Sequence, residues 1–236
     1  MSHEVAGPSV AGKFPKFTAT RWSNNVPVSV IVKFSGADNS AAVQRWSDLL
    51  VCEHLALETL QAHTDIAAAQ SRIHRFAGRT FLEVARFDRT GLYGRLPICT
   101  LGSLADALIG QRAEWPVLIE TLVKNGWLAS GQASIVKTVW LFGRLIANAD
   151  MHEGNLSFRP GLTLAPIYDM LPMQYAPARG GELAPQRYSP PLPFPQEINA
   201  WRVAAHAALW RFGRLLKMTR ALVWRFSKPV RKIMAS

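Results

Sequence analysis

Residues 148–155 read "NADMHEGN" and place one aspartate, one histidine and two asparagines within eight positions. The segment follows the apolar run "IVKTVWLFGRLIA" (135–147) and leads into "LSF" (156–158). This pattern predicts a buried helix that ends just before the polar residues. Polar groups are costly to bury without partners, so a dense polar cluster between two apolar segments indicates a functional loop.

Length and composition fit a globular protein. The chain has 236 residues, of which 49% are hydrophobic and 18% charged, and it can form one core or two lobes that share a cleft. The first residues, "MSHEVAGPSV", lack the features of a signal peptide, and no apolar run is long enough to predict a transmembrane segment. Cys52 and Cys99 form no CxxC motif. These features predict a cytoplasmic protein with reduced cysteines.

The net charge of +11 is concentrated near the C-terminus. Residues 201–236 contain nine Lys or Arg and no Asp or Glu, which leaves 18 basic and 16 acidic residues, a net charge of +2, elsewhere. On a helical wheel, residues 209–226 place leucines and phenylalanines on one face and arginines on the other. This predicts a basic amphipathic helix. A solvated helix of the fold and a surface for anionic membranes or acidic partners both remain open.

The order of predicted elements favours an α+β protein of two unequal lobes. Strands are expected early and helices late, with helical signals dominating from about residue 103 and a proline-rich connector at 185–195. The other expected elements are strands at 26–34 and 79–89, a helix at 39–63 with Asn39 or Ser40 as N-cap, short strands at 155–160 and 163–169, and a final helix at about 197–226.

Phosphoryl transfer from ATP needs a defined set of groups. A backbone-rich loop covers the phosphates, a lysine binds their oxygens, Asp and Asn oxygens hold Mg²⁺, and a further carboxylate orients the attacking hydroxyl. The chain offers these residue types in the order found in protein kinases, namely Gly7 to Gly12, Lys33, Glu53, Asp150 with Asn155 in Asp-x4-Asn spacing, and Asp169. We therefore predict that Asp150 accepts the substrate proton and that Asn155 and Asp169 bind Mg²⁺.

Each motif also has a simpler interpretation. Residues 7–16 could be a flexible tail, and their near match to a Walker A loop places Phe14 where a hydroxyl residue should bind Mg²⁺. Lys33 could be a solvated edge residue and Glu53 a surface charge on an amphipathic helix. Asp150 and His152 could bind a hydrolytic metal as D-x-H, although such a site needs further ligands.

The full set of motifs resembles the HipA family of bacterial serine/threonine kinases, the toxins of toxin–antitoxin modules. The resemblance covers roughly residues 7–210 and rests on six segments, of which the last two given below are the most specific. The segments are "SVAGKFPKF" (9–17), "VIVKF" (30–34), "VCEHLALETL" (51–60), "FLEVARFDR" (81–89), "LIANADMHEGNLSF" (145–158) and "LAPIYDMLPM" (164–173).

The resemblance implies a protein-kinase-like fold with a mostly helical C-lobe, the use of ATP and Mg²⁺, and phosphorylation of protein serines or threonines. Known members act on aminoacyl-tRNA synthetases and are restrained by a helix-turn-helix antitoxin, so a protein substrate, an antitoxin and DNA association through that antitoxin are expected. The lobes would be residues 1–98, a partial N-lobe, and 99–196, with a basic helix and tail at 197–236.

Carried onto this chain, the resemblance implies Asp150 as the catalytic base and Asn155 and Asp169 as metal ligands. Ser9 falls at a regulatory serine that some members autophosphorylate, and a phosphate there adds about two negative charges beside the nucleotide. The residues implied to contact ATP are Ser9, Val10, Ala11, Gly12, Lys16, Lys33, Glu53, Ala85 and Phe87.

Two departures from the family pattern bear on activity. Ala85 stands where members usually have an acidic residue, although backbone contacts to adenine would survive this change. The phosphate loop begins six residues after Met1, whereas family members carry a substantial region before it. The sequence therefore predicts an N-lobe that lacks a strand. The alternative function is an inactive kinase remnant that binds protein or nucleic acid.

Overall fold

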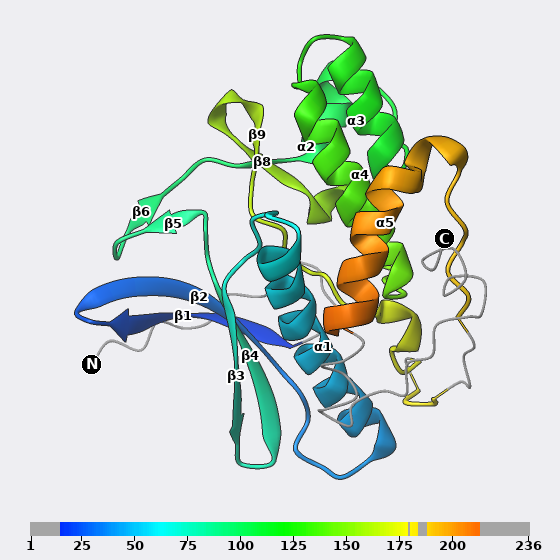
Figure 1. Ribbon diagram of the computed structural model, residues 1–236. Helices are drawn as coiled ribbons and strands as arrows, with labels where there is room; N and C mark the ends of the chain where they lie inside the picture. Colours follow the sequence, from blue (N-terminus) through cyan, green and yellow to red (C-terminus); the bar gives the residue numbers. More distant parts are fainter. Residues whose placement is uncertain (1–14, 179, 184–187, 213–236) are drawn as a thin grey trace.

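The computed structural model describes residues 15–178, 180–183 and 188–212. A four-stranded antiparallel sheet lies on one side of the molecule and most of the helices lie on the other, with α1 (Ala41–His63) between them (Figure 1). The fold is therefore mixed α and β, with strands early and helices late, as predicted.

The large sheet has the strand order β1-β2-β4-β3. Its strands are β1 (Lys16–Ser23), β2 (Val26–Phe34), β3 (Ser71–Phe76) and β4 (Arg79–Ala85). Lys33 of β2 is opposite Lys16 of β1 and Leu82 of β4. Because β2 is an inner strand, the edge interpretation of Lys33 is wrong.

The structure adds two strands to the large sheet and shortens one predicted strand. The strands β1 and β3 were not predicted, and the strand expected at 79–89 ends at Ala85. The backbone N–H of Arg86 still donates to the carbonyl of Ser29 on β2 at 2.9 Å, and the chain then turns at 87–88, which ends the pairing. A two-stranded ribbon follows, formed by β5 (Arg89–Thr90) and β6 (Gly94–Arg95).

Helix α1 begins where the sequence predicted. The Ser40 side chain accepts a hydrogen bond from the backbone N–H of Val43, so Ser40 is the N-cap, a position that hydroxyl residues stabilise. The leucines at helical spacing are buried, among them Leu49, Leu57 and Leu60. Leu82 and Val84 of β4 belong to the same hydrophobic core. The helix is thereby fixed against the sheet.

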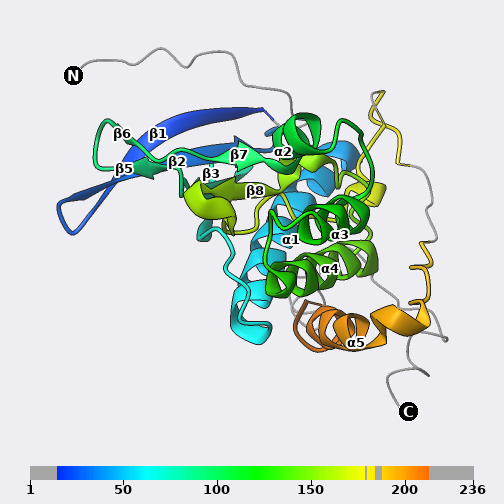
Figure 2. The ribbon, with the colours of Figure 1, turned by 90° about the horizontal axis from the view of Figure 1, so that it is seen from above.

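The second part of the molecule is mostly helical (Figure 2). Its elements are β7 (Cys99–Thr100), α2 (Leu101–Leu108), α3 (Trp115–Lys124), α4 (Ser130–Leu145), β8 (Ser157–Arg159), β9 (Thr163–Leu164) and α5 (Ile198–His206). The short strands form a sheet of order β7-β8-β9. The predicted strand at 163–169 is thus mainly extended chain, of which Ile167 makes a parallel bridge to Ala68.

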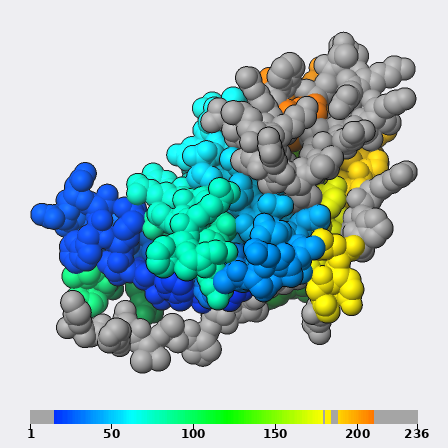
Figure 3. Space-filling model, turned by 90° about the horizontal axis from the view of Figure 1, so that it is seen from below, coloured from blue at the N-terminus to red at the C-terminus, as the bar shows by residue number. Residues whose placement is uncertain are grey.

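The start of α1 contacts the segment that follows Asp169. The guanidinium of Arg45 donates to the carbonyl of Tyr175 at 3.2 Å, and the space-filling view from below shows these two parts of the chain side by side (Figure 3). This contact joins the strand-rich and helical parts on one face.

The last described residues pack on the helical part. Trp201 of α5 is 1% exposed, and the hydroxyl of Tyr188 donates to the carbonyl of Arg144 on α4 at 2.6 Å. A π-helical segment (Ala207–Phe212) follows α5. Most of the predicted basic helix at 209–226 lies outside the described residues. Among the described helices, none is long and apolar enough to span a membrane.

Candidate active site

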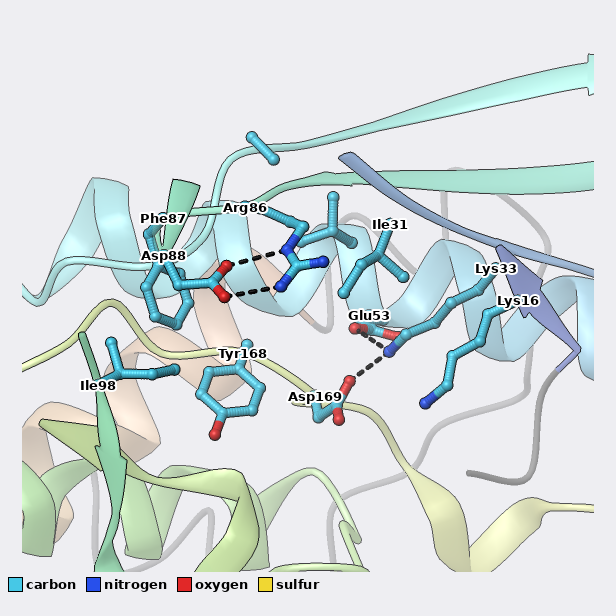
Figure 4. A pocket seen from close by; sticks show the side chains of 12 residues that line it. Lys16, Ile31, Lys33, Glu53, Arg86, Phe87, Asp88, Ile98, Tyr168 and Asp169 are labelled. Atoms are coloured by element: carbon cyan, nitrogen blue, oxygen red, sulfur yellow. Dashed lines mark hydrogen bonds and ion pairs between the residues drawn. The ribbon is translucent and has the colours of Figure 1, made fainter. Parts of the chain in front are cut away.

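One lysine and two carboxylates meet where the sheet, α1 and the segment after β9 come together. The ammonium of Lys33 donates to both carboxylate oxygens of Glu53, at 2.8 and 2.9 Å, and to Oδ1 of Asp169 (Figure 4). These residues are 20 and 136 positions from Lys33 in the sequence. Their convergence is therefore a product of the tertiary fold.

Burial and charge set the protonation of this cluster. Burial alone would lower the pKa of Lys33, but the charges of Glu53 and Asp169 outweigh it and raise that pKa. Burial and the neighbouring Asp169 raise the pKa of Glu53, which is 1% exposed. Burial opposes ionisation of Asp169 as well, yet Lys33 holds its pKa below the usual value. Lys33 and Asp169 thus stay charged at neutral pH.

A cavity of about 210 Å³ opens beside these charged groups. One side of it carries Lys16, Lys33, Glu53 and Asp169. The rest of the lining is mostly apolar, and it consists of Ile31, Val84, Ala85, Phe87, Ile98 and Tyr168 together with the Arg86–Asp88 ion pair. Such a division suits a ligand with a flat apolar part and an anionic part.

Sequence reasoning missed several residues of this cavity. Ile31, Val84 and Ile98 are aliphatic residues with no local signal, since an apolar residue on a strand is usually part of the core. Tyr168 was overlooked although it stands next to Asp169 in "APIYDM". Its ring centroid lies 5.7 Å from that of Phe87.

The turn after β4 is held by ion pairs. Arg86 forms a two-pronged contact with Asp88 at 2.9 and 2.7 Å, and Arg89 adds a third contact to the same carboxylate at 2.5 Å. Burial alone would raise the pKa of Asp88, but the two arginines outweigh it and lower that pKa. These ion pairs hold the turn between β4 and β5.

The loop at 148–155 is tied to Asp169 by hydrogen bonds. The side chain of Asn148 donates to the carbonyl of Asp169 at 3.3 Å and accepts from the backbone N–H of Asp150 at 3.0 Å. The buried side chain of Asn155 donates to the carbonyl of Asp150 at 2.9 Å. Both Asp150 and Asn155 are therefore held in a fixed loop next to the segment that carries Asp169.

Tyr168 adds a second link between the same two segments. Its hydroxyl donates to the carbonyl of Gly154 and lies 2.7 Å from the hydroxyl of Ser157. Burial raises the pKa of Tyr168 to about 12, so the hydroxyl keeps its proton at neutral pH. Asp169 itself has φ of +53°, a conformation uncommon outside glycine that often marks functional sites.

The structure brings together six of the predicted site residues in the cavity wall, and these are Lys16, Lys33, Glu53, Ala85, Phe87 and Asp169. Asp150 and Asn155 do not line this cavity but lie on the adjoining loop. The surface-charge interpretation of Glu53 is wrong, because its side chain is buried. Ser9, Val10, Ala11 and Gly12 lie outside the described residues.

The donor set fits magnesium better than a hydrolytic transition metal. Within the described ranges, no three His, Cys, Asp or Glu side chains form a metal-binding group, and Nδ1 of His152 accepts from the backbone N–H of Gly154. The D-x-H alternative therefore has no support there. Asn155 and Asp169 offer two hard oxygen ligands, which suits Mg²⁺ because that ion keeps water and phosphate oxygens in its shell.

Comparisons with known proteins place this chain in one protein family. Residues 8–223 match the family described as "HipA-like C-terminal domain". Toxin YjjJ of Escherichia coli (strain K12) is 39% identical over 187 residues, which make up 78% of this chain and 42% of that protein. The chain thus spans less than half the length of this curated relative.

A solved structure shares the fold. It is the complex of the Shewanella oneidensis MR-1 toxin–antitoxin proteins HipA and HipB with operator DNA, with a TM-score of 0.61 and 18% identity. The match covers 97% of this chain and 62% of the other. At this low identity the likeness shows the fold alone, and that fold is kinase-like.

Proposed function

The chain belongs to the family of HipA-like C-terminal domains, and from this premise we propose that it is an ATP-dependent serine/threonine protein kinase of the HipA toxin type. The observation that carries the proposal is the contact of Lys33 with both Glu53 and Asp169 at the wall of the cavity. This contact supports the proposal because phosphoryl transfer uses a lysine paired with a helix glutamate, and because Asp169 lies where it would hold the metal ion.

Each residue has a defined role in this proposal. The apolar side of the cavity would hold adenine, with the backbone of residues 85–87 at its edge, while Lys33 and Lys16 would bind phosphate oxygens. Glu53 would keep Lys33 in place. Asn155 and Asp169 would hold the Mg²⁺ that neutralises phosphate charge when Mg-ATP is bound.

Asp150 would act on the protein substrate. Its carboxylate would accept the proton of the attacking serine or threonine hydroxyl, as the corresponding aspartate does in protein kinases. The hydrogen bonds of Asn148 and Asn155 to the Asp150 backbone would fix its position. Catalysis would thus rest on positioning and charge neutralisation.

The partners follow from the relatives. The HipA of Shewanella is seen in complex with HipB and operator DNA, and we propose that this chain also binds an antitoxin and reaches DNA through it. An aminoacyl-tRNA synthetase would be the protein substrate, and the cytoplasm the place of action.

A comparison of the wild-type chain with Asp150→Asn tests the function. Mg-ATP should raise the melting temperature of both proteins, because Asp150 does not line the nucleotide cavity. Phosphate transfer from γ-³²P-labelled ATP to the chain or to a synthetase should be seen only with the wild type. Transfer at the wild-type rate by Asp150→Asn would contradict the proposed role.

The competing function is that of an inactive remnant that binds nucleic acid through its basic C-terminal segment. It is favoured by the nine basic and no acidic residues at 201–236. A chain that shows no thermal response to Mg-ATP but binds DNA in a salt-sensitive way would support the remnant.

A further inference from the structure

A second and larger cavity lies between the β1–β2 hairpin and the β5–β6 ribbon. Its volume is about 450 Å³. We call it the outer pocket, and it adjoins the first cavity because Arg86 lines both. Phosphoryl transfer as proposed above makes no use of it. Most of its lining is polar, and the polar residues are Thr18, Thr20, Ser29, Arg86, Arg89 and Arg95.

The hydroxyl residues come from facing positions of two strands. Thr20 of β1 is opposite Ser29 of β2, and Thr18 is opposite Ile31, which lines the first cavity. Directly opposed residues of an antiparallel pair project from the same face of a sheet. The outer pocket therefore continues along the sheet face that carries the candidate active site.

The charges of the outer pocket are not balanced. Arg86 uses Nε and Nη2 for Asp88, and Arg89 uses Nη1 for the same residue. Among the described residues, no carboxylate forms an ion pair with Arg95, which is exposed. Two of the three guanidinium groups thus share one carboxylate and the third has no described carboxylate partner, so that the described charges sum to about +2.

We propose that the outer pocket binds a dianionic phosphate group. A guanidinium has five N–H donors in a planar fork that matches phosphate oxygens, and the pairs formed are charge-assisted. Arg86 and Arg89 keep donors that Asp88 does not occupy, Arg95 has no side-chain hydrogen bond to another described residue, and the hydroxyls of Thr18, Thr20 and Ser29 line the same pocket. The excess charge of about +2 is opposite in sign and similar in size to the charge of a phosphate monoester near neutral pH, about −1.5 to −2.

The size of the pocket indicates that the phosphate is attached to an organic group. The volume falls within the roughly 300–1,000 Å³ typical of pockets for organic ligands and is more than inorganic phosphate alone would fill. Tyr93 also lines the pocket and is 91% exposed, so its ring is free to cover an organic group. The ligand is then a phosphate monoester, either a small molecule or a phosphorylated side chain of a protein.

Titration calorimetry on the full chain tests the proposal with two probes, inorganic phosphate and a phosphoserine peptide. Arg95→Gln should weaken binding of either probe roughly tenfold or more, as expected for the loss of a charged hydrogen bond. Lys16→Gln, in the first cavity, should leave binding of the phosphoserine peptide unchanged, whereas any inorganic phosphate bound in the first cavity would be sensitive to it. Arg159→Gln, an exposed arginine of β8, is the matched control for loss of one positive charge.

The outcomes separate the sources of the phosphate. Peptide binding that is much tighter than that of inorganic phosphate would assign a phosphorylated side chain, whereas similar affinities would assign a small phosphate. The proposal is overturned if neither probe binds at millimolar concentration, or if Lys16→Gln weakens binding and Arg95→Gln does not. Either result would overturn only the proposal for the outer pocket. The kinase proposal is tested independently by the thermal response of the chain to Mg-ATP.

Discussion

Lys33 shares one positive charge between Glu53 and Asp169, and this sharing is the central feature at the scale of single residues. The cluster carries a net charge of −1 if all three groups are ionised. Asp169 is the more accessible carboxylate, with a side chain 33% exposed against 1% for Glu53. A cation that enters the cavity would therefore meet Asp169 first, while Glu53 retains Lys33.

Glu53→Gln tests this division of roles. The substitution keeps the shape of the side chain but removes the buried charge, so that Lys33 pairs mainly with Asp169 and competes with the metal ion. We expect the dissociation constant for Mg-ATP to rise about tenfold or more, the equivalent of one charged hydrogen bond. Fluorescence titration with a labelled nucleotide would measure it.

Glu58→Gln is the matched control, because Glu58 lies on the same helix and half of its side chain is exposed. It should leave nucleotide affinity unchanged. Equal effects of the two variants would mean that Glu53 acts only through the overall charge of α1.

Asp88 gives a pH-dependent prediction. Arg86 and Arg89 lower its pKa in the folded chain below the roughly 3.9 of an unfolded aspartate. A depressed folded pKa stabilises the protein above the unfolded pKa, and this contribution is lost as the pH falls through the folded value. The wild type should therefore be more stable than Asp88→Asn at pH 7, and the difference should shrink below about pH 4.

Urea denaturation at several pH values would measure this difference, with Asp65→Asn, at an exposed position, as the control. A stability difference between wild type and Asp88→Asn that is constant from pH 7 to pH 3 would show that the ion pairs of Asp88 contribute nothing.

Some residues of the candidate site could be predicted from the sequence and others could not. Lys33, Glu53 and Asp169 could be predicted because they follow one another in the order found in protein kinases, and the structure brings them into contact. Ile31, Val84 and Ile98 could not, because an apolar side chain that lines a cavity has the same sequence signal as one that fills a core. The catalytic and metal-binding roles of Asp150 and Asn155 stay predictions.

At the scale of elements, α4 approaches the 148–155 loop closely at Gly143. A Cβ built at this position would overlap the Sδ atom of Met151. It would lie 2.7 Å from the Cε atom of Met151 and 3.3 Å from the Sδ atom of Met170. Met151 follows Asp150 directly. The absence of a side chain at Gly143 therefore allows the loop to lie against the helix.

Gly143→Ala should separate these two elements. In an exposed helix this change stabilises by about 1 kcal/mol, but here Met151 must move, so we expect the gain to be cancelled and phosphate transfer to fall severalfold. Gly131→Ala on the same helix has open space around its Cβ and should show the ordinary stabilisation. Melting temperatures and transfer rates of both variants would test this, and equal behaviour would contradict it.

In the large sheet, the strands that sequence reasoning missed are the two edge strands, β1 and β3. The sequence of β3, "SRIHRF", is mostly charged or polar, and only Ile73 packs against the core. Edge strands tolerate such residues because one side faces solvent, which removes the alternation that identifies a strand. The inner strand β2 and the buried helix α1 kept clear patterns and were predicted within two residues.

At the scale of the whole molecule, the nucleotide cavity and the basic segment are separate in sequence. The described residues that line the cavity lie between positions 16 and 169, while the excess of positive charge lies at 201–236. The kinase interpretation therefore depends on the residues of the cavity, whereas the remnant interpretation depends on the basic segment at 201–236.

Replacing Arg214, Lys217, Arg220 and Arg225 by glutamine in the full chain separates these interpretations. Phosphate transfer and the thermal response to Mg-ATP should stay within about twofold of the wild type, since the described residues that line the cavity lie between positions 16 and 169. DNA binding by the chain should weaken, and the slope of its logarithmic affinity against salt should fall by about 0.9 for each lost phosphate contact. The reverse pattern, in which transfer is abolished and DNA affinity is intact, would mean that the basic segment completes the active site. A charge that only contacts DNA does not alter the chemistry at Lys33 and Asp169.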